Sequence, residues 1–140
     1  MEKICVSDLS IGDWVIVEWP DGERWRSRLT QLSVTGAVEV CCANDKHVRC
    51  SDGFISAIPI TAEILEKNGW SEFSDYHNSW KLDIDSDKRV WMFKNSHDWT
   101  FQVMSWGLGH NHSVAKAYIK DIHELQHALR LAKVGKEIVL

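Results

Sequence analysis

Turn-forming residues interrupt the first 60 positions every six to ten residues, and this spacing limits what the segment can fold into. Pro20-Asp21-Gly22 and Ser51-Asp52-Gly53 are two of these turns. Between the turns lie strand-like stretches that are too short for a helix: residues 14–19 are almost entirely apolar, and charged and uncharged residues alternate over residues 24–29. The pattern predicts five short strands, and therefore a small, strongly bent β-barrel of the SH3-like kind over residues 1–59.

A second region is predicted after Pro59, over residues 60–140. Thr61 is a good N-cap, and Asn68-Gly69 provides the left-handed end of a short helix. Alternating residues then predict several antiparallel strands, and apolar residues at helical spacing after Asp121 predict a C-terminal helix packed on them. The predicted fold class is α+β: an N-terminal SH3-like small β-barrel followed by a helix, an antiparallel sheet and a C-terminal helix.

The composition narrows the function classes. Lys and Arg number 16 against 20 Asp and Glu, and the net charge of −4 argues against a nonspecific nucleic-acid binder, which carries a basic excess. No apolar stretch approaches the roughly 18 residues of a membrane span, and the polar start of the chain lacks the apolar region of a secretion signal. We therefore expect a soluble, cytoplasmic protein with no membrane partner. Its four cysteines do not suggest a disulfide framework, so reduced thiols are expected.

His123-Glu124-Leu125-Gln126-His127 matches the zinc-peptidase pattern H-E-x-x-H. In that pattern two imidazoles one helical turn apart bind the metal, and the glutamate activates a metal-bound water. Asp121 followed three residues later by Glu124 also fits a capping box, which gives the carboxylate a structural role where the helix begins at Ile122. The extended zinc motif is incomplete, because Arg130 and Lys133 occupy the positions of its glycine and third histidine. We favour the capping interpretation.

The predicted direction of the two histidine side chains also argues against a zinc-peptidase site. Residues placed at 100° intervals form an apolar stripe that contains Ile122, Leu125, Leu129 and Ala132. His123 and His127 lie well over 100° from the centre of that stripe, so they are predicted to face away from the core. A zinc-peptidase helix is usually buried, with its histidines facing a cleft.

Two weaker metal sites can be drawn from the sequence. His110 and His112 are separated by one residue, so they can bind one metal from a strand and form a four-ligand site with His123 and His127. Loop histidines beside glycine are more often simply solvated. The group of Cys41, Cys42, His47 and Cys50 lacks a C-x-x-C knuckle, and Cys42 fits an inward strand position. No metal or cofactor is therefore predicted.

Arg24-Trp25-Arg26-Ser27-Arg28 is the best candidate for binding a partner. The three guanidinium groups on one strand face could bind phosphate or an acidic peptide, and Trp25 could stack on a base. A solvated strand face is the simpler interpretation, with arginine stems over tryptophan and with Glu18 or Glu23 as partners across the hairpin. The acidic charge of the whole chain favours this simpler interpretation.

Three blocks of sequence are distinctive: residues 11–15 (Ile-Gly-Asp-Trp-Val), residues 58–70, and residues 123–126 together with Glu137-Ile138. Together they resemble a group of small uncharacterised proteins from gut bacteria and their prophages or other mobile elements. The resemblance implies a shared fold and no particular activity. Similar proteins often carry Asn at the position of His127, which implies that the full zinc motif is incidental in this chain.

The chain is rich in tryptophan, with eight among its 140 residues. Trp14, Trp19 and Trp25 do not all easily fit inside a small barrel, so at least one is expected to face a partner or the second region. We predict a non-enzymatic binding or accessory module of phage or mobile-element type, acting on an unknown protein partner or by self-association. The alternatives are a zinc-dependent hydrolase and a nucleic-acid-binding module that uses the arginine face of residues 24–28.

Overall fold

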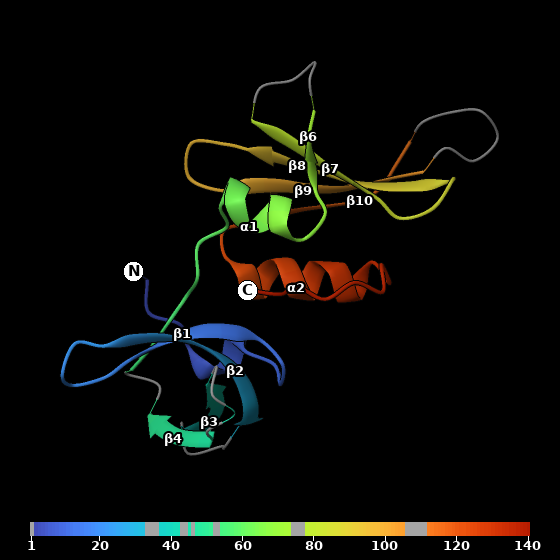
Figure 1. Ribbon diagram of the computed structural model, residues 1–140. Coiled ribbons are helices and arrows are strands. Elements are labelled where there is room, and N and C mark those ends of the chain that lie inside the picture. Colours follow the sequence, from blue (N-terminus) through green and yellow to red (C-terminus); the bar gives the residue numbers. More distant parts are fainter. Residues whose placement is uncertain are drawn as a thin grey trace. The chain divides into compact units, whose positions relative to one another are not determined.

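The computed structural model describes residues 2–32, 37–42, 45, 47–51, 54–73, 78–105 and 112–140. The chain forms two compact units, Met1–Pro59 together with Leu140, and Ile60–Val139 (Figure 1). Each unit contains one five-stranded antiparallel sheet, and the two α-helices of the described residues belong to the second unit. The predicted α+β class is therefore confirmed. Neither helix combines the length and the apolar character that crossing a lipid bilayer requires.

The first sheet is an antiparallel meander whose last strand returns to pair with the first. A short 3-10 turn (Val6–Asp8) precedes it. Its strands are β1 (Trp14–Glu18), β2 (Arg24–Leu32), β3 (Ala37–Cys42), β4 (His47–Ser51) and β5 (Ile55–Ser56), in the order β4-β3-β2-β1-β5. A register shift between Leu29 and Gln31 marks a bulge between β2 and β3, and bulges increase strand bending. Within the described residues β4 and β5 are not paired, so the sheet is a half-barrel, and the predicted closed barrel is met only in part.

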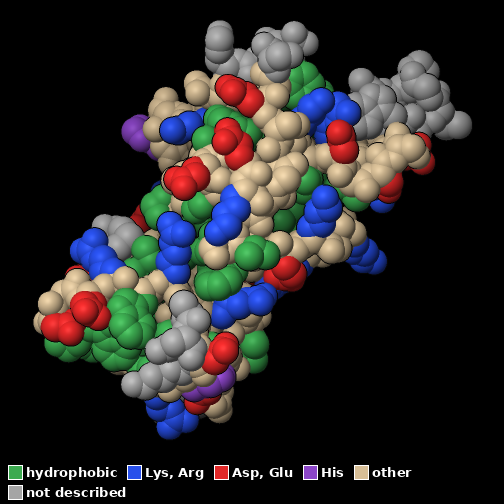
Figure 2. Space-filling model, viewed as in Figure 1, with side chains coloured by type: hydrophobic (Ala, Val, Ile, Leu, Met, Phe, Trp, Pro, Cys, Tyr) green, Lys and Arg blue, Asp and Glu red, His purple; other side chains and the backbone are tan. Residues whose placement is uncertain are grey.

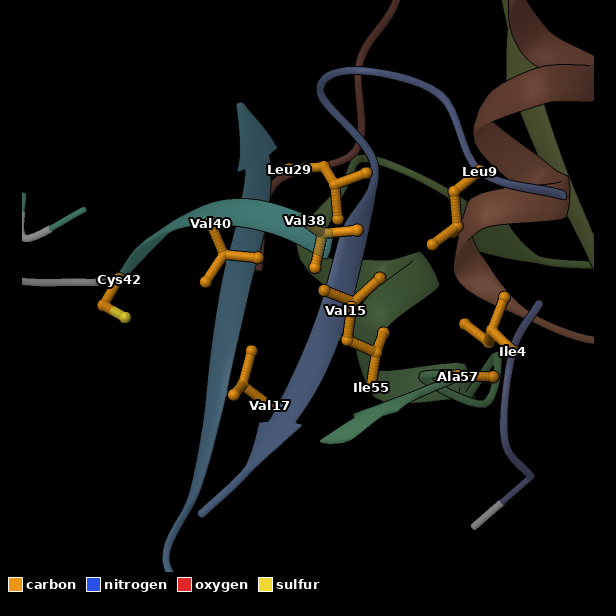
Figure 3. Close-up of a cluster of buried hydrophobic side chains, with 10 residues drawn as sticks. All are labelled: Ile4, Leu9, Val15, Val17, Leu29, Val38, Val40, Cys42, Ile55 and Ala57. Atoms are coloured by element: carbon orange, nitrogen blue, oxygen red, sulfur yellow. The ribbon is translucent and has the colours of Figure 1, made fainter. Parts of the chain in front are cut away.

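The concave side of this sheet holds the core of the first unit. Side chains from four strands point toward one another there: Val15, Val17, Leu29, Val38, Val40 and Ile55 (Figure 3). Residues of opposite parity on β1 and β2 are half-buried or exposed, as strand alternation requires. Cys42 is also buried on the concave side, which confirms its predicted inward position.

A tight turn before β1 explains the first of the distinctive sequence blocks. Gly12 has a φ of +92°, a conformation that glycine adopts without strain. The fully buried Asp13 carboxylate accepts a hydrogen bond from the Ser10 backbone N–H at 2.7 Å. The backbone of the same turn is paired with Leu29, through Gly12 N to Leu29 O at 2.8 Å and Leu29 N to Asp13 O at 2.9 Å. The Gly-Asp pair of residues 11–15 therefore has a structural role.

The second unit begins with helix α1 (Ala62–Lys67). The Ile64 N–H donates to the Thr61 hydroxyl at 3.3 Å, which confirms the predicted N-cap. The helix ends at Asn68, and Gly69 follows with a φ of +85°, which confirms the predicted left-handed end. The Asn68 side chain also bonds the backbone of Val139, donating to its carbonyl at 2.8 Å and accepting from its N–H at 2.7 Å.

The second sheet has the order β10-β9-β8-β7-β6. Its strands are β6 (Ser71–Glu72), β7 (Ser79–Asp83), β8 (Lys88–Lys94), β9 (Trp99–Ser105) and β10 (His112–Ile119). Sequence alternation predicted all of them except the two-residue β6, which is too short to show a period. One face of the sheet is buried, with Val90, Met92, Phe101 and Val103 at its centre.

Helix α2 (Ile122–Leu131) covers that buried face through Ile122, Leu125 and Leu129 (Figure 1). Residues 134–139 follow α2 without regular structure. The segment is nevertheless anchored, because Val134 and Ile138 are buried. Glu137 accepts two hydrogen bonds from the Arg130 guanidinium at 3.2 Å each.

Candidate functional site

Glu124 of the H-E-x-x-H motif lies at the start of α2 and bonds the backbone. Its Oε2 accepts the Lys120 N–H at 2.5 Å and the Asp121 N–H at 3.4 Å. The arrangement is the predicted capping box, with Asp121 as the N-cap residue. The carboxylate that a zinc peptidase would use to activate water is therefore engaged with the free amides that precede the helix.

The predicted direction of the histidines is wrong for His123. Its side chain is only 6% exposed, and Gln126 beside it is buried as well, whereas His127 is half-buried. Glu137, in the segment after the helix, bonds Gln126 at 3.4 Å and Arg130 at 3.2 Å, and Gln126 lies one helical turn from His123. The returning segment thus covers a flank that the helical periodicity alone leaves open to water.

The two imidazoles of α2 lie together, but no third metal ligand from the described residues joins them. Their ring centroids are 5.9 Å apart and the rings are nearly perpendicular. His112 is exposed at the start of β10, and His110 lies outside the described residues. Across the part of the chain that the structure describes, no three His, Cys, Asp or Glu side chains are grouped to hold a metal ion.

The cysteine group also differs from a metal centre. Cys41 and Cys42 are adjacent on β3 and therefore point to opposite faces of the sheet. Burial raises the pKa of the Cys50 thiol, and the neighbouring Cys42 raises it further. A raised pKa keeps the thiol protonated at neutral pH, which disfavours both metal binding and nucleophilic attack by this group.

Replacing Glu124 distinguishes its two roles. Glutamine retains a side-chain oxygen that caps the helix, so Glu124→Gln is expected to leave stability almost unchanged, whereas Glu124→Ala lowers the unfolding free energy by about 0.5–1 kcal/mol. Urea denaturation followed by circular dichroism measures both variants. A catalytic carboxylate would behave differently: Glu124→Gln would abolish a zinc-dependent hydrolysis while stability stayed constant.

The arginine row lies on the convex face of β2 and is largely occupied by its own neighbours. Arg24 forms an ion pair with Glu18 at 3.6 Å. The Arg28 guanidinium lies 5.6 Å from the centroid of the Trp14 ring, and its Nε donates to the Gly12 carbonyl at 3.2 Å. Arg26 alone has no ion pair or hydrogen bond within the described ranges. Within this row, a phosphate chain would therefore find one unengaged guanidinium, that of Arg26.

Trp25 lies on the other face of the same strand. It follows the parity of the buried Ser27 and Leu29, but it extends past the core and is 37% exposed. Its ring meets Trp19 edge-on with centroids 6.3 Å apart, and its Nε1 donates to Glu23 at 3.1 Å. The structure therefore separates Trp25 from the guanidinium groups of Arg24, Arg26 and Arg28, which the sequence had grouped as one patch.

A pocket of about 300 Å³ opens beside these aromatic rings, at the end of the half-barrel near the β1–β2 turn. We call it the aromatic mouth; its lining residues are Trp19, Pro20, Arg49, Cys50, Ser51 and Phe54. Trp19 and Cys50 pack against the core, and Phe54 is 41% exposed. Figure 2 shows hydrophobic side chains gathered at this end of the first unit, with acidic side chains beside them. Sequence reasoning missed the mouth, because its residues come from three separate turns and strand ends.

Comparisons with protein-family models, with curated proteins and with solved structures found no match to this chain.

Proposed function

We propose that this chain is a non-enzymatic binding module whose first unit takes up a short protein segment at the aromatic mouth. The observation that carries the proposal is the pocket itself, which continues the concave core and ends in Trp19, Pro20 and Phe54. Binding sites are typically concave and mostly apolar, and the mouths of β-barrels are common places for them. An apolar side chain that entered this pocket would leave water for aromatic contact on several sides.

The strand order supports a related proposal, that the first unit is a small SH3-like barrel. The meander β1 to β4 and the return of β5 to β1 give the connectivity of a barrel that is left open between β4 and β5. Small barrels of this kind bind extended segments on exposed aromatic residues, and that argument is an analogy from fold alone. A role among accessory proteins of phages or mobile elements belongs to the same proposal and depends on the sequence resemblance.

Charge favours a protein segment over a nucleic acid at the mouth. Asp21 and Glu23 lie in the turn that follows Pro20, next to the pocket wall. These carboxylates would repel a phosphate chain, and the net charge of −4 gives no compensating attraction. Arg49 lines the mouth and supplies one positive charge against these two carboxylates, whereas the arginine row lies on the opposite face of the sheet, away from the mouth.

The test uses an array of short blocked peptides that differ only in a central residue: leucine, proline, tryptophan or serine. We expect the full chain to bind the apolar peptides more tightly than the serine peptide. Phe54→Ala should weaken that binding at least about tenfold, because it removes an exposed wall of the pocket. Fluorescence anisotropy of labelled peptides gives the dissociation constants.

Two control variants belong to the same experiment. Ile11→Ala removes another exposed apolar side chain, at the opposite end of β1, and should leave peptide binding unchanged. Arg26→Glu reverses the unengaged charge of the convex face and should also have no effect on the peptides. The proposal fails if Phe54→Ala binds the peptides like the original chain. It also fails if a single-stranded thymidine oligonucleotide binds more tightly than any peptide and loses affinity on Arg26→Glu.

A further inference from the structure

β10 forms one edge of the second sheet and is more exposed than a strand of its length normally is. Only Ile119 among its eight residues is buried. Its inner side pairs with β9, and in the described ranges no strand pairs with its outer side. Native proteins usually shorten or cover such an edge, because its unpaired N–H and C=O groups accept another strand.

A groove lies directly inside this edge, between β10 and α2. Ala115 and Ala117 face the helix, but their side chains are too short to fill the space above Phe101. Ala128, Leu131 and Ala132 of the helix side form the other wall. Lys116 of β10 also borders the pocket, which measures about 220 Å³. That volume accepts a leucine-sized side chain. Leu131 is 85% exposed, so the wall of the groove is itself apolar surface in contact with water.

The outer face of β10 carries an apolar, a basic and an apolar side chain in succession. Lys116 lies between two exposed apolar residues, Val114 and Tyr118. Its ammonium group is 5.4 Å from the centroid of the Tyr118 ring, and no carboxylate pairs with it among the described residues. A strand laid along this edge would place an apolar, an acidic and an apolar side chain opposite these three residues.

The positive charge of Lys116 indicates which kind of chain would pair with the β10 edge. A second copy of the chain would bring a β10 that has a lysine and no carboxylate, so self-pairing would gather like charges at the edge. Lysine and a bulge, here between Ser113 and Ala115, are also the usual devices against indiscriminate edge pairing. A different protein that carries a glutamate or aspartate between apolar residues satisfies the unpaired lysine.

We propose that β10 binds an extended acidic segment of a partner protein, which adds to the second sheet as a sixth strand and places an apolar side chain in the groove beneath α2. Main-chain hydrogen bonds to the β10 edge would supply affinity, and the groove together with Lys116 would supply specificity. This surface belongs to the second unit and is separate from the aromatic mouth, so either proposal can fail without the other.

The probe is a blocked peptide with the core valine-leucine-glutamate-leucine-valine and polar flanks. Added to the full isotopically labelled chain, it should shift the backbone resonances of residues 112–119 and slow hydrogen exchange at the outer edge of β10. Lys116→Glu should weaken the binding of this peptide at least about tenfold. It should strengthen the binding of a matched peptide that has lysine in place of glutamate. Leu131→Ala should weaken the binding of both peptides several-fold, because it removes one wall of the groove.

N-methylation of the peptide separates strand addition from simple contact. Methyl groups on the amides that face β10 should abolish binding, whereas methyl groups on the alternate amides should not, because successive amides of a strand point to opposite edges. Phe54→Ala serves as the control that should leave this binding unchanged.

Three results would overturn the proposal. The first is an absence of binding up to about 1 mM peptide, which corresponds to a binding free energy weaker than about −4 kcal/mol. The second is equal binding of both N-methylated series. The third is a concentration-dependent dimer of the chain alone that Lys116→Glu changes in analytical ultracentrifugation, because it would identify a second copy as the occupant of the edge.

Discussion

Leu125→Ala is expected to lower the unfolding free energy of the second unit by about 2–5 kcal/mol. Leu125 is fully buried at the centre of the face that α2 presents to the sheet. Truncation to alanine removes apolar contact and leaves a cavity that the flanking Ile122 and Leu129 cannot fill without moving the helix. Urea denaturation followed by the far-ultraviolet circular dichroism of the helix measures the change, with the slope m held as a check on two-state behaviour.

The same substitution on the same helix provides the control. Leu131 is 85% exposed, so Leu131→Ala should change the unfolding free energy by no more than about 0.5 kcal/mol. Both variants lose the same atoms and have the same helix propensity, so their difference reports burial alone. Equal effects of the two variants would mean that α2 does not pack on the sheet through Leu125.

Asp13→Ala is expected to destabilise the first unit by about 1.5–3 kcal/mol. The Asp13 carboxylate is fully buried and accepts the Ser10 N–H, so its removal leaves a backbone donor without that acceptor before β1. Amide hydrogen exchange of β1 and β2 measures the effect locally.

Asp13→Asn is the matched variant, because its amide oxygen can still accept the Ser10 N–H at the same place. We expect it to recover at least half of the loss seen with alanine. If alanine and asparagine behave alike, the hydrogen bond to Ser10 is not what holds the turn.

The strands and caps were predictable because their signals are local. Alternation over four or more residues located β2, β7 and β9, and the cap residues Thr61 and Glu124 follow from the chemistry of a single helical turn. The closed barrel was not equally predictable. Whether β4 and β5 meet depends on the accumulated bend of the whole sheet, which no short window of sequence contains.

The positions of the site residues depended on contacts between distant segments. His123 appeared to face water because periodicity treats a helix as if one side alone were covered, whereas His123 is buried and Glu137 bonds Gln126 one turn further along α2. The aromatic mouth unites Trp19 with Phe54, and the strand-edge groove unites Ala117 with Ala128. Concavity of this kind arises from the tertiary arrangement, so the sequence shows its residues without showing that they meet.

The bond between Asn68 and the tail of the second unit has an evolutionary consequence. The hydrogen bonds of the carboxamide to residue 139 involve its main chain, and the Val139 side chain is 59% exposed. Natural variation at position 139 can therefore be wide, provided that the residue is not proline, because proline lacks the N–H that Asn68 accepts. Position 68 tolerates less variation, because the Asn68 carboxamide donates both to the Ile64 carbonyl at the end of α1 and to the Val139 carbonyl, 71 residues away.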